Sequence, residues 1–149
     1  MADLDLATRL VDQFFSEIAD SYCRKDLDAI IGHYQPDPGL LFWNAEGDTI
    51  TSVDQLTLWY EELFRRFDIK SVNFRLEEIY ADESTIVSGS LWVLSTLRKP
   101  GEEKPGEEKP GEEKLEEEQS LRATHLLKKH DGRWLIHHLH VSPTHFLPD

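Results

Sequence analysis

The sequence predicts the α+β class, in which a curved sheet wraps around a layer of helices. Apolar residues recur at three- and four-residue steps in the first part of the chain, which is typical of helices that bury one face. From residue 71 the period changes to two, which is typical of strands. Asp131-Gly132 separates the last two strand-like runs, and this pair is a strong hairpin signal because glycine accepts positive φ. Helices grouped first and antiparallel strands grouped last indicate an α+β domain.

Three helices are predicted in the first half of the chain. The first carries one apolar stripe, formed by Leu6, Leu10, Val11, Phe14, Phe15, Ile18 and Tyr22. The second lies in "KDLDAIIGHY" and ends at "QPDPG", because proline disfavours helical geometry at and before its own position. The third begins at an S-x-x-Q capping box, Ser52 to Gln55. It buries a wide face formed by Leu56, Trp59, Tyr60, Leu63, Phe64 and Phe67.

Five strands are predicted around and after these helices. "LLFW" is a short buried strand between the second and third helices, and "NAEGD" is the turn that follows it. Four long strands come after the third helix, in the runs "SVNFRLEEIY", "TIVSGSLWVLST", "SLRATHLLKK" and "RWLIHHLHVS".

A charged pentapeptide repeat, "KPGEEKPGEEKPGEEK", separates the second and third of these long strands. The pentads contain no apolar residue that could join a core, so the segment cannot offset the entropy lost on ordering. We expect a solvated hairpin loop at residues 99–118, because loop closure becomes only slowly more costly with length. The alternative is an acidic tether that binds a partner.

Charge and composition exclude several classes of function. The 149 residues carry a net charge of −13, and the segment 99–118 supplies −5 of it through four Lys and nine Glu. The remaining −8 argues against nucleic-acid or anionic-membrane surfaces, which require basic patches. Cys23 is the single cysteine, and no apolar run approaches the ~20 residues that span a bilayer. With no signal peptide visible, we expect a cytoplasmic protein.

The closing hairpin carries a motif, R-x-T followed by D-G-x-W-x-I-x-H-x-H-x-S, in "RATHLLKKHDGRWLIHHLHVS". It resembles the last two strands of SnoaL-like domains in the nuclear transport factor 2-like (ketosteroid isomerase-like, cystatin-like) superfamily. It is also similar to the closing hairpin of the calcium/calmodulin-dependent protein kinase II association domain. The resemblance covers nearly the whole chain outside the repeat. It implies a cone-shaped fold, helices in the concave face of a strongly curved mixed or antiparallel sheet, an open pocket, and oligomers through the outer sheet face.

Two registers of this hairpin follow from two turn lengths. A two-residue turn places His125 opposite His138, whereas a three-residue turn with a bulge places Thr124 opposite His138 and Arg122 opposite His140. We favour the second register, because it collects apolar side chains on an outer face that suits a dimer interface. These side chains are Leu121, Ala123, Leu127, Leu139 and Val141.

A candidate pocket follows from the same period. His138, His140 and Ser142 share one face of the last strand, and Arg122 and Thr124 face them in the favoured register. Arginine and a near-neutral histidine favour a carboxylate or enolate-like ligand. The apolar wall is expected from Tyr22, Trp43, Trp59, Tyr60 and Trp92. The alternative is that these polar side chains are structural members of a half-buried strand.

Steroid isomerisation is not expected by the mechanism that the resemblance implies. The general-base aspartate position of the isomerases falls on Asn44, and their oxyanion tyrosine position falls near Ile18, with Tyr22 one turn later. An amide cannot abstract a proton, and isoleucine cannot donate a hydrogen bond. Asp37 and Glu46 are carboxylates near the expected pocket mouth that could take another acid–base role.

No cofactor and no metal are expected. His138 and His140 lie roughly 6.5–7 Å apart along a strand, and His137 points to the other face. Three converging ligands, which zinc requires, would need His125 in the register that we do not favour.

We therefore expect one SnoaL-like domain over residues 1–149, with a pocket for a small organic ligand, anionic if Arg122 faces it. A homodimer or higher homo-oligomer is expected. One alternative is an association module like the kinase hub domain. Another is a polyketide cyclase- or isomerase-type enzyme without the ketosteroid isomerase Asp/Tyr set. Catalysis stays open, and its best candidates are His140, His138 and Arg122.

Overall fold

The computed structural model describes residues 4–36, 39–99 and 116–144. Within these ranges the chain forms α1 (Leu4–Arg24), α2 (Leu27–Ile31), β1 (Leu41–Trp43), β2 (Thr49–Ile50), α3 (Val53–Arg66), β3 (Phe67–Ala81), β4 (Thr85–Arg98), β5 (Glu116–His130) and β6 (Arg133–Pro143). Every predicted helix and strand is present, and β2 is an additional short strand. Among the described helices, none is both long and apolar enough to cross a membrane.

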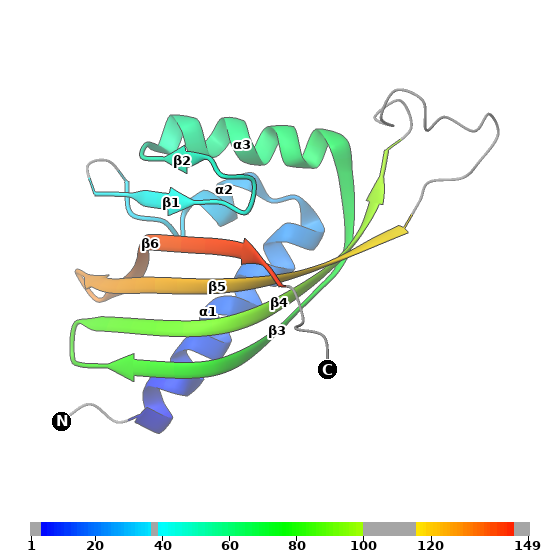
Figure 1. Ribbon diagram of the computed structural model, residues 1–149. Helices are drawn as coiled ribbons and strands as arrows, with labels where there is room; N and C mark the ends of the chain where they lie inside the picture. Colours follow the sequence, from blue (N-terminus) through cyan, green and yellow to red (C-terminus); the bar gives the residue numbers. More distant parts are fainter. Residues whose placement is uncertain (1–3, 37–38, 100–115, 145–149) are drawn as a thin grey trace, which may run out of the picture.

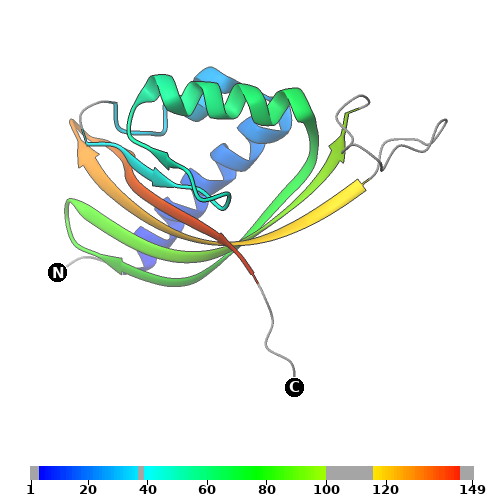
Figure 2. The same cartoon turned by 45° about the horizontal axis from the view of Figure 1, so that its top comes forward.

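The strands form one mixed sheet in the order β2-β1-β6-β5-β4-β3. β1 is parallel to β6, whereas the other neighbouring pairs are antiparallel. The long strands cross α1 in Figure 1. In Figure 2 these strands curve beneath α1, and α3 lies at the top, on the concave side of the sheet. The helices thus lie in the concave face of a curved sheet, which confirms the predicted α+β fold.

Local signals explain how α3 is positioned over the sheet. The Ser52 hydroxyl caps the helix by accepting a hydrogen bond from the Gln55 amide at 3.1 Å. The Gln55 side chain accepts from the backbone amide of Thr51 at 2.8 Å, one residue before the position expected for a capping box. At the other end, Phe67 is extended and begins β3 directly, so α3 and the longest edge of the sheet are joined without a loop.

The apolar stripe of α1 supplies the centre of the core. Val11 and Phe15 are fully buried, whereas Leu6, in the first turns of the helix, is exposed. The Phe15 ring packs edge-on against Phe74 of β3 and Trp92 of β4, with centroid distances of 5.6 and 5.0 Å. This contact anchors α1 to the half of the sheet that is farthest from β1.

The β5–β6 hairpin begins with a two-residue turn. Asp131 and Gly132 both have positive φ, 49° and 83°, which is the geometry that an Asp-Gly turn favours. From this turn the strands pair in register as far as Leu127 opposite Ile136. The three-residue turn of the favoured register is therefore wrong.

A β-bulge at His137 then shifts the register by one residue. Beyond the bulge, Leu126 lies opposite His138 and Thr124 lies opposite His140. Neither predicted pairing of His138, with His125 or with Thr124, occurs. Because side chains alternate along a strand, one extra residue moves every later side chain of β6 to the other face of the sheet.

The loop predicted at residues 99–118 falls mostly outside the described residues. β4 and β5 pair as far as Leu97 opposite Glu116. Glu117 forms an ion pair with Arg98 at 2.9 Å. The last three residues of the predicted loop therefore belong to β5.

Replacing residues 100–115 with a short glycine-containing turn is expected to change the free energy of unfolding by no more than about 1 kcal/mol, toward higher stability. The reason is that Leu97 and Glu116 are already paired, so a short connection can join the strands. Urea denaturation checks stability, and light scattering checks the oligomeric state. A glycine–serine segment of the original length is the control. A lower stability or a changed oligomeric state would show that the natural segment contributes contacts.

Candidate functional site

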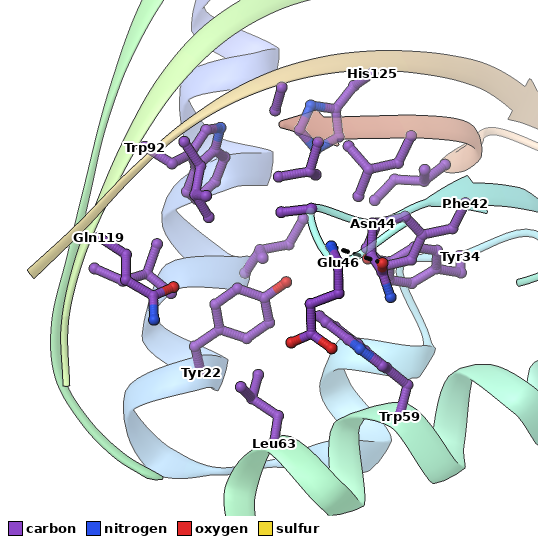
Figure 3. Close-up of a pocket in the computed structure, with 18 of the residues that line it drawn as sticks. Tyr22, Tyr34, Phe42, Asn44, Glu46, Trp59, Leu63, Trp92, Gln119 and His125 are labelled. Atoms are coloured by element: carbon purple, nitrogen blue, oxygen red, sulfur yellow. Dashed lines mark hydrogen bonds between the residues drawn. The ribbon is translucent and has the colours of Figure 1, made fainter. Parts of the chain in front are cut away.

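A cavity of about 320 Å³ lies between the concave face of the sheet and the helices. Its size is at the lower end of the range for small-molecule sites. Figure 3 shows side chains from the helices, the β1–β2 turn and the long strands converging on it. It is lined by Ile18, Tyr22, Tyr34, Phe42, Asn44, Ala45, Glu46, Trp59, Leu63, Arg66, Phe67, Trp92, Leu94, Gln119, Leu121, Ala123, His125, Ile136, Leu139 and Val141.

Three tyrosines form a chain of hydrogen-bonded hydroxyls along the helical side of this cavity. The Tyr60 hydroxyl lies 2.6 Å from the Tyr22 hydroxyl and 2.7 Å from the Tyr34 hydroxyl. Tyr22 and Tyr34 line the cavity, and Tyr60 lies between them, fully buried. We call Tyr22, Tyr60 and Tyr34 the tyrosine chain.

The tyrosine chain has one proton more than its internal hydrogen bonds use. Burial raises the pKa of Tyr22, and it raises the pKa of Tyr34 and of Tyr60 well above the ordinary value, so all three hydroxyls are protonated at neutral pH. Three protons serve two hydrogen bonds. When Tyr60 donates to either neighbour, the hydroxyl of that neighbour keeps its own proton for an acceptor in the cavity.

Tyr60→Phe is expected to lower the free energy of unfolding by about 1–3 kcal/mol, because it leaves the buried hydroxyl of Tyr34 without its partner. Chemical denaturation measures the change. Tyr80→Phe is the matched control. Tyr80 is 63% exposed, so removal of its hydroxyl should lower the free energy of unfolding by no more than about 0.5 kcal/mol. Equal effects of the two substitutions would show that the tyrosine chain does not stabilise the fold.

Asn44 lines the cavity, but its amide already has hydrogen-bond partners in the β1–β2 turn. Its side-chain oxygen accepts from the backbone amides of Glu46 and Asp48 at 3.0 and 2.9 Å. Its side-chain nitrogen donates to the Asp48 carboxylate at 3.2 Å. Asn44, which the resemblance aligns with the isomerase base, thus holds the turn together, and Ile18, near the position aligned with the oxyanion tyrosine, contributes only an apolar surface.

The charged side chains of the lining are found where the cavity opens to solvent. Glu46 and Arg66 are both exposed, and the Arg66 guanidinium pairs with Glu62 at 2.8 Å. Gln119, on β5, is exposed as well. The buried part of the lining is therefore uncharged at neutral pH, including His125, which burial keeps neutral.

Three of the predicted aromatic residues, Tyr22, Trp59 and Trp92, line the cavity. Trp43 does not, because it lies on the opposite face of the sheet and is 43% exposed. Its ring is edge-on to His138 and His140, with centroid distances of 5.0 and 5.5 Å.

The polar candidates are found together on that opposite, outer face of the sheet. His138 lies with Nδ1 at 3.0 Å from the Leu41 carbonyl oxygen, and Arg122 donates to the Ser142 hydroxyl at 3.3 Å. Thr124 lies opposite His140, and both are exposed. None of these five residues is part of the cavity lining. The bulge at His137 turns His138, His140 and Ser142 to the outer face, whereas Arg122 and Thr124 lie there because β5 alternates regularly.

The residues predicted on the outer face lie inside, those of β5 because the hairpin turn has two residues and those of β6 because of the bulge. Leu121, Ala123, Leu139 and Val141 line the cavity, and Leu127 is fully buried. The favoured register is therefore wrong about both faces of the hairpin, because the face predicted to be outside lines the cavity and the face predicted to line the cavity is outside.

His125 is the functional candidate that the sequence reasoning missed. It lines the cavity from β5, and burial lowers its pKa from 6.5 to about 3. Its Nδ1 is buried and has no hydrogen-bond partner among the described residues. The signal was present in the sequence, because His125 is two residues from both Ala123 and Leu127 and strict alternation places all three on one face.

Among the described residues, no three His, Cys, Asp or Glu side chains are grouped so that they could hold a metal ion.

Comparisons with known proteins agree with this architecture. A model of the SnoaL-like domain family matches residues 11–145. A nuclear transport factor 2-like protein of unknown function from Shewanella oneidensis superposes with a TM-score of 0.68 at 20% identity, covering 91% of this chain and 98% of that protein. No relative is found among curated proteins.

Two further solved structures carry the names that the sequence resemblance suggested. A ketosteroid isomerase-like protein from Erwinia carotovora has a TM-score of 0.70 at 13% identity, with 89% of this chain and 92% of that chain covered. A putative calcium/calmodulin-dependent protein kinase II association domain from Xanthomonas campestris has a TM-score of 0.59 at 17% identity, with 97% and 89% covered. These identities show a shared fold, and with the family match they confirm the resemblance.

Proposed function

Since the chain belongs to the family of SnoaL-like domains, we propose that its cavity binds a small, uncharged and mostly apolar organic molecule. The observation that carries this proposal is the tyrosine chain, which offers a hydroxyl proton to an acceptor inside a mostly apolar cavity. A carbonyl or ether oxygen would satisfy this donor without bringing a charge into the cavity.

An uncharged ligand is favoured over the anionic ligand that Arg122 and the two histidines predicted. Those side chains lie on the other face of the sheet, and Arg66 is exposed at the mouth and paired with Glu62. Burial of an unpaired carboxylate against the aromatic wall would be costly, because no cation lines the buried part. The apolar part of the ligand would pack against Trp59, Trp92 and Phe42.

Titration with 2-naphthol, an uncharged aromatic alcohol, tests this proposal by isothermal calorimetry. The wild type is expected to bind one equivalent per chain. Ala123→Phe should abolish binding, because Ala123 lines the cavity and the larger ring would occupy it. Thr124→Phe is the matched control, since the neighbouring residue is exposed on the outer face and its substitution should leave affinity unchanged.

Absence of binding to the wild type, or equal binding to both variants, would contradict a ligand site in the cavity. Native mass spectrometry of the purified protein gives an independent measurement, because it reports any bound small molecule together with the number of subunits.

A second candidate function is acid–base catalysis on such a ligand. The observation that favours it is the position of Glu46, whose exposed side chain lines the same cavity as Tyr22 and Trp59. Glu46 could accept a proton while the tyrosine chain stabilises negative charge on the ligand oxygen. Glu46→Gln would then abolish turnover of a carbonyl ligand but leave its binding intact.

We further propose that the chain forms a homodimer through the outer face of the sheet. Half-buried apolar side chains lie on that face, among them Leu91, Val93 and Leu126, together with the exposed ring of Trp43. The alternative is a larger ring, as in an association module. Light scattering distinguishes a dimer, a ring and a monomer by mass.

A further inference from the structure

The buried end of the cavity contains a polar side chain that the proposed function does not use. His125 is 4% exposed and projects from β5 into the concave side of the sheet. Its ring centroid lies 4.6 Å from that of Phe15 and 6.0 Å from that of Trp92, so aromatic packing fixes its orientation. In Figure 3 the imidazole lies on the β5 side of the cavity, away from Glu46 and the mouth.

One nitrogen of this imidazole is left unpaired by the described residues. Nδ1 is fully buried and has no hydrogen-bond partner in the described part of the chain. Ser88, directly opposite on β4, also has a buried hydroxyl without a partner there. Buried polar atoms are almost always hydrogen-bonded, so an unpaired imidazole in a cavity wall indicates a partner that comes from outside the protein.

The chemistry of the site restricts what that partner is. A neutral imidazole has one N–H donor and one acceptor nitrogen, which matches a hydroxyl group because a hydroxyl both donates and accepts. Burial keeps the ring neutral, so it cannot compensate the charge of a carboxylate or phosphate. Phe15, Trp92 and Leu139 pack around the ring with apolar or aromatic surface, and the neighbouring Ser88 hydroxyl is uncharged as well.

We infer that the buried end of the cavity recognises a hydroxyl group of the ligand through the imidazole of His125. The ligand class is then an apolar alcohol or phenol whose second polar atom, an acceptor, meets the tyrosine chain. The inference rests on the proposed function, since it requires that the cavity binds a ligand at all, and it adds the position and the kind of one polar group.

A comparison of 2-naphthol with naphthalene tests the hydroxyl directly, because the two probes share one ring system. The wild type is expected to bind 2-naphthol about tenfold more tightly than naphthalene. His125→Phe should remove this preference and leave the affinity for naphthalene unchanged. His130→Phe, the same substitution at an exposed position of the same strand, should keep the preference.

Equal affinities of the wild type for the two probes, or a preference that persists in His125→Phe, would overturn the inference while the proposed ligand site stands. Binding of neither probe would overturn the proposed function itself. If His125→Phe fails to fold, ¹⁵N NMR of the wild type gives the answer. The ¹⁵N resonances of the His125 ring should shift on addition of 2-naphthol but not on addition of naphthalene. Identical chemical-shift changes with the two probes would overturn the inference.

Discussion

Phe15→Ala is expected to lower the free energy of unfolding by about 3–5 kcal/mol. Phe15 is fully buried and packs against Trp92, His125 and Phe74, so its removal takes away the main contact between α1 and the long strands. The cavity that is left would be closed only in part, because the sheet on one side and the helix on the other are both held by other contacts.

Urea denaturation of the wild type and the variant measures this loss. Leu58→Ala is the matched control, since Leu58 is 66% exposed on α3 and should cost no more than about 0.5 kcal/mol. Similar losses for the two variants would show that α1 is not the centre of the core. A variant that also binds larger apolar probes would show that the Phe15 ring forms part of the cavity floor.

The helices and the regular strands could be predicted from sequence, because they depend on local periodicity. The stripe of α1, the Ser52 cap of α3 and the strict alternation of β5 each follow from spacing along the chain. The aromatic residues Tyr22, Trp59 and Trp92 line the cavity for the same reason, since each lies on the apolar face of a regular element.

The bulge at His137 could not be predicted in this way, because it depends on two segments that are distant in sequence. At Ile136, the backbone of β6 donates to the His33 carbonyl and accepts from the Gln35 amide. Immediately after the bulge, β6 pairs instead with β1, beginning with His138 opposite Leu41. One strand thus changes its neighbour at this point, and the extra residue accommodates the change.

This extra residue explains why the predicted site residues of β6 do not reach the cavity. With unbroken alternation, His138, His140 and Ser142 would share a face with Ile136, which is buried. The bulge places Leu139 and Val141 there instead, and the three polar residues lie on the outer face. The histidine that does reach the cavity, His125, lies on the neighbouring strand, which is regular.

Acidification is expected to destabilise the protein through this buried histidine. In the folded chain the pKa of His125 is about 3, because burial disfavours the charged ring, whereas an exposed histidine has a pKa of 6.5. Between these two values the unfolded state binds the additional proton, so the stability falls as the pH falls below 6.5. By pH 4 the contribution of His125 amounts to a loss of about 3 kcal/mol relative to pH 7.

The loss is separable from the titration of carboxylates, which also weakens the fold in acid. Urea denaturation of the wild type and His125→Phe at pH 7, 6, 5 and 4 gives two curves of stability against pH. Above pH 5 the carboxylates contribute little to either curve, so the wild type should lose more stability there than the variant, in which only other histidines such as His137 still titrate. Parallel curves would mean that the ring is charged or solvated in the folded protein.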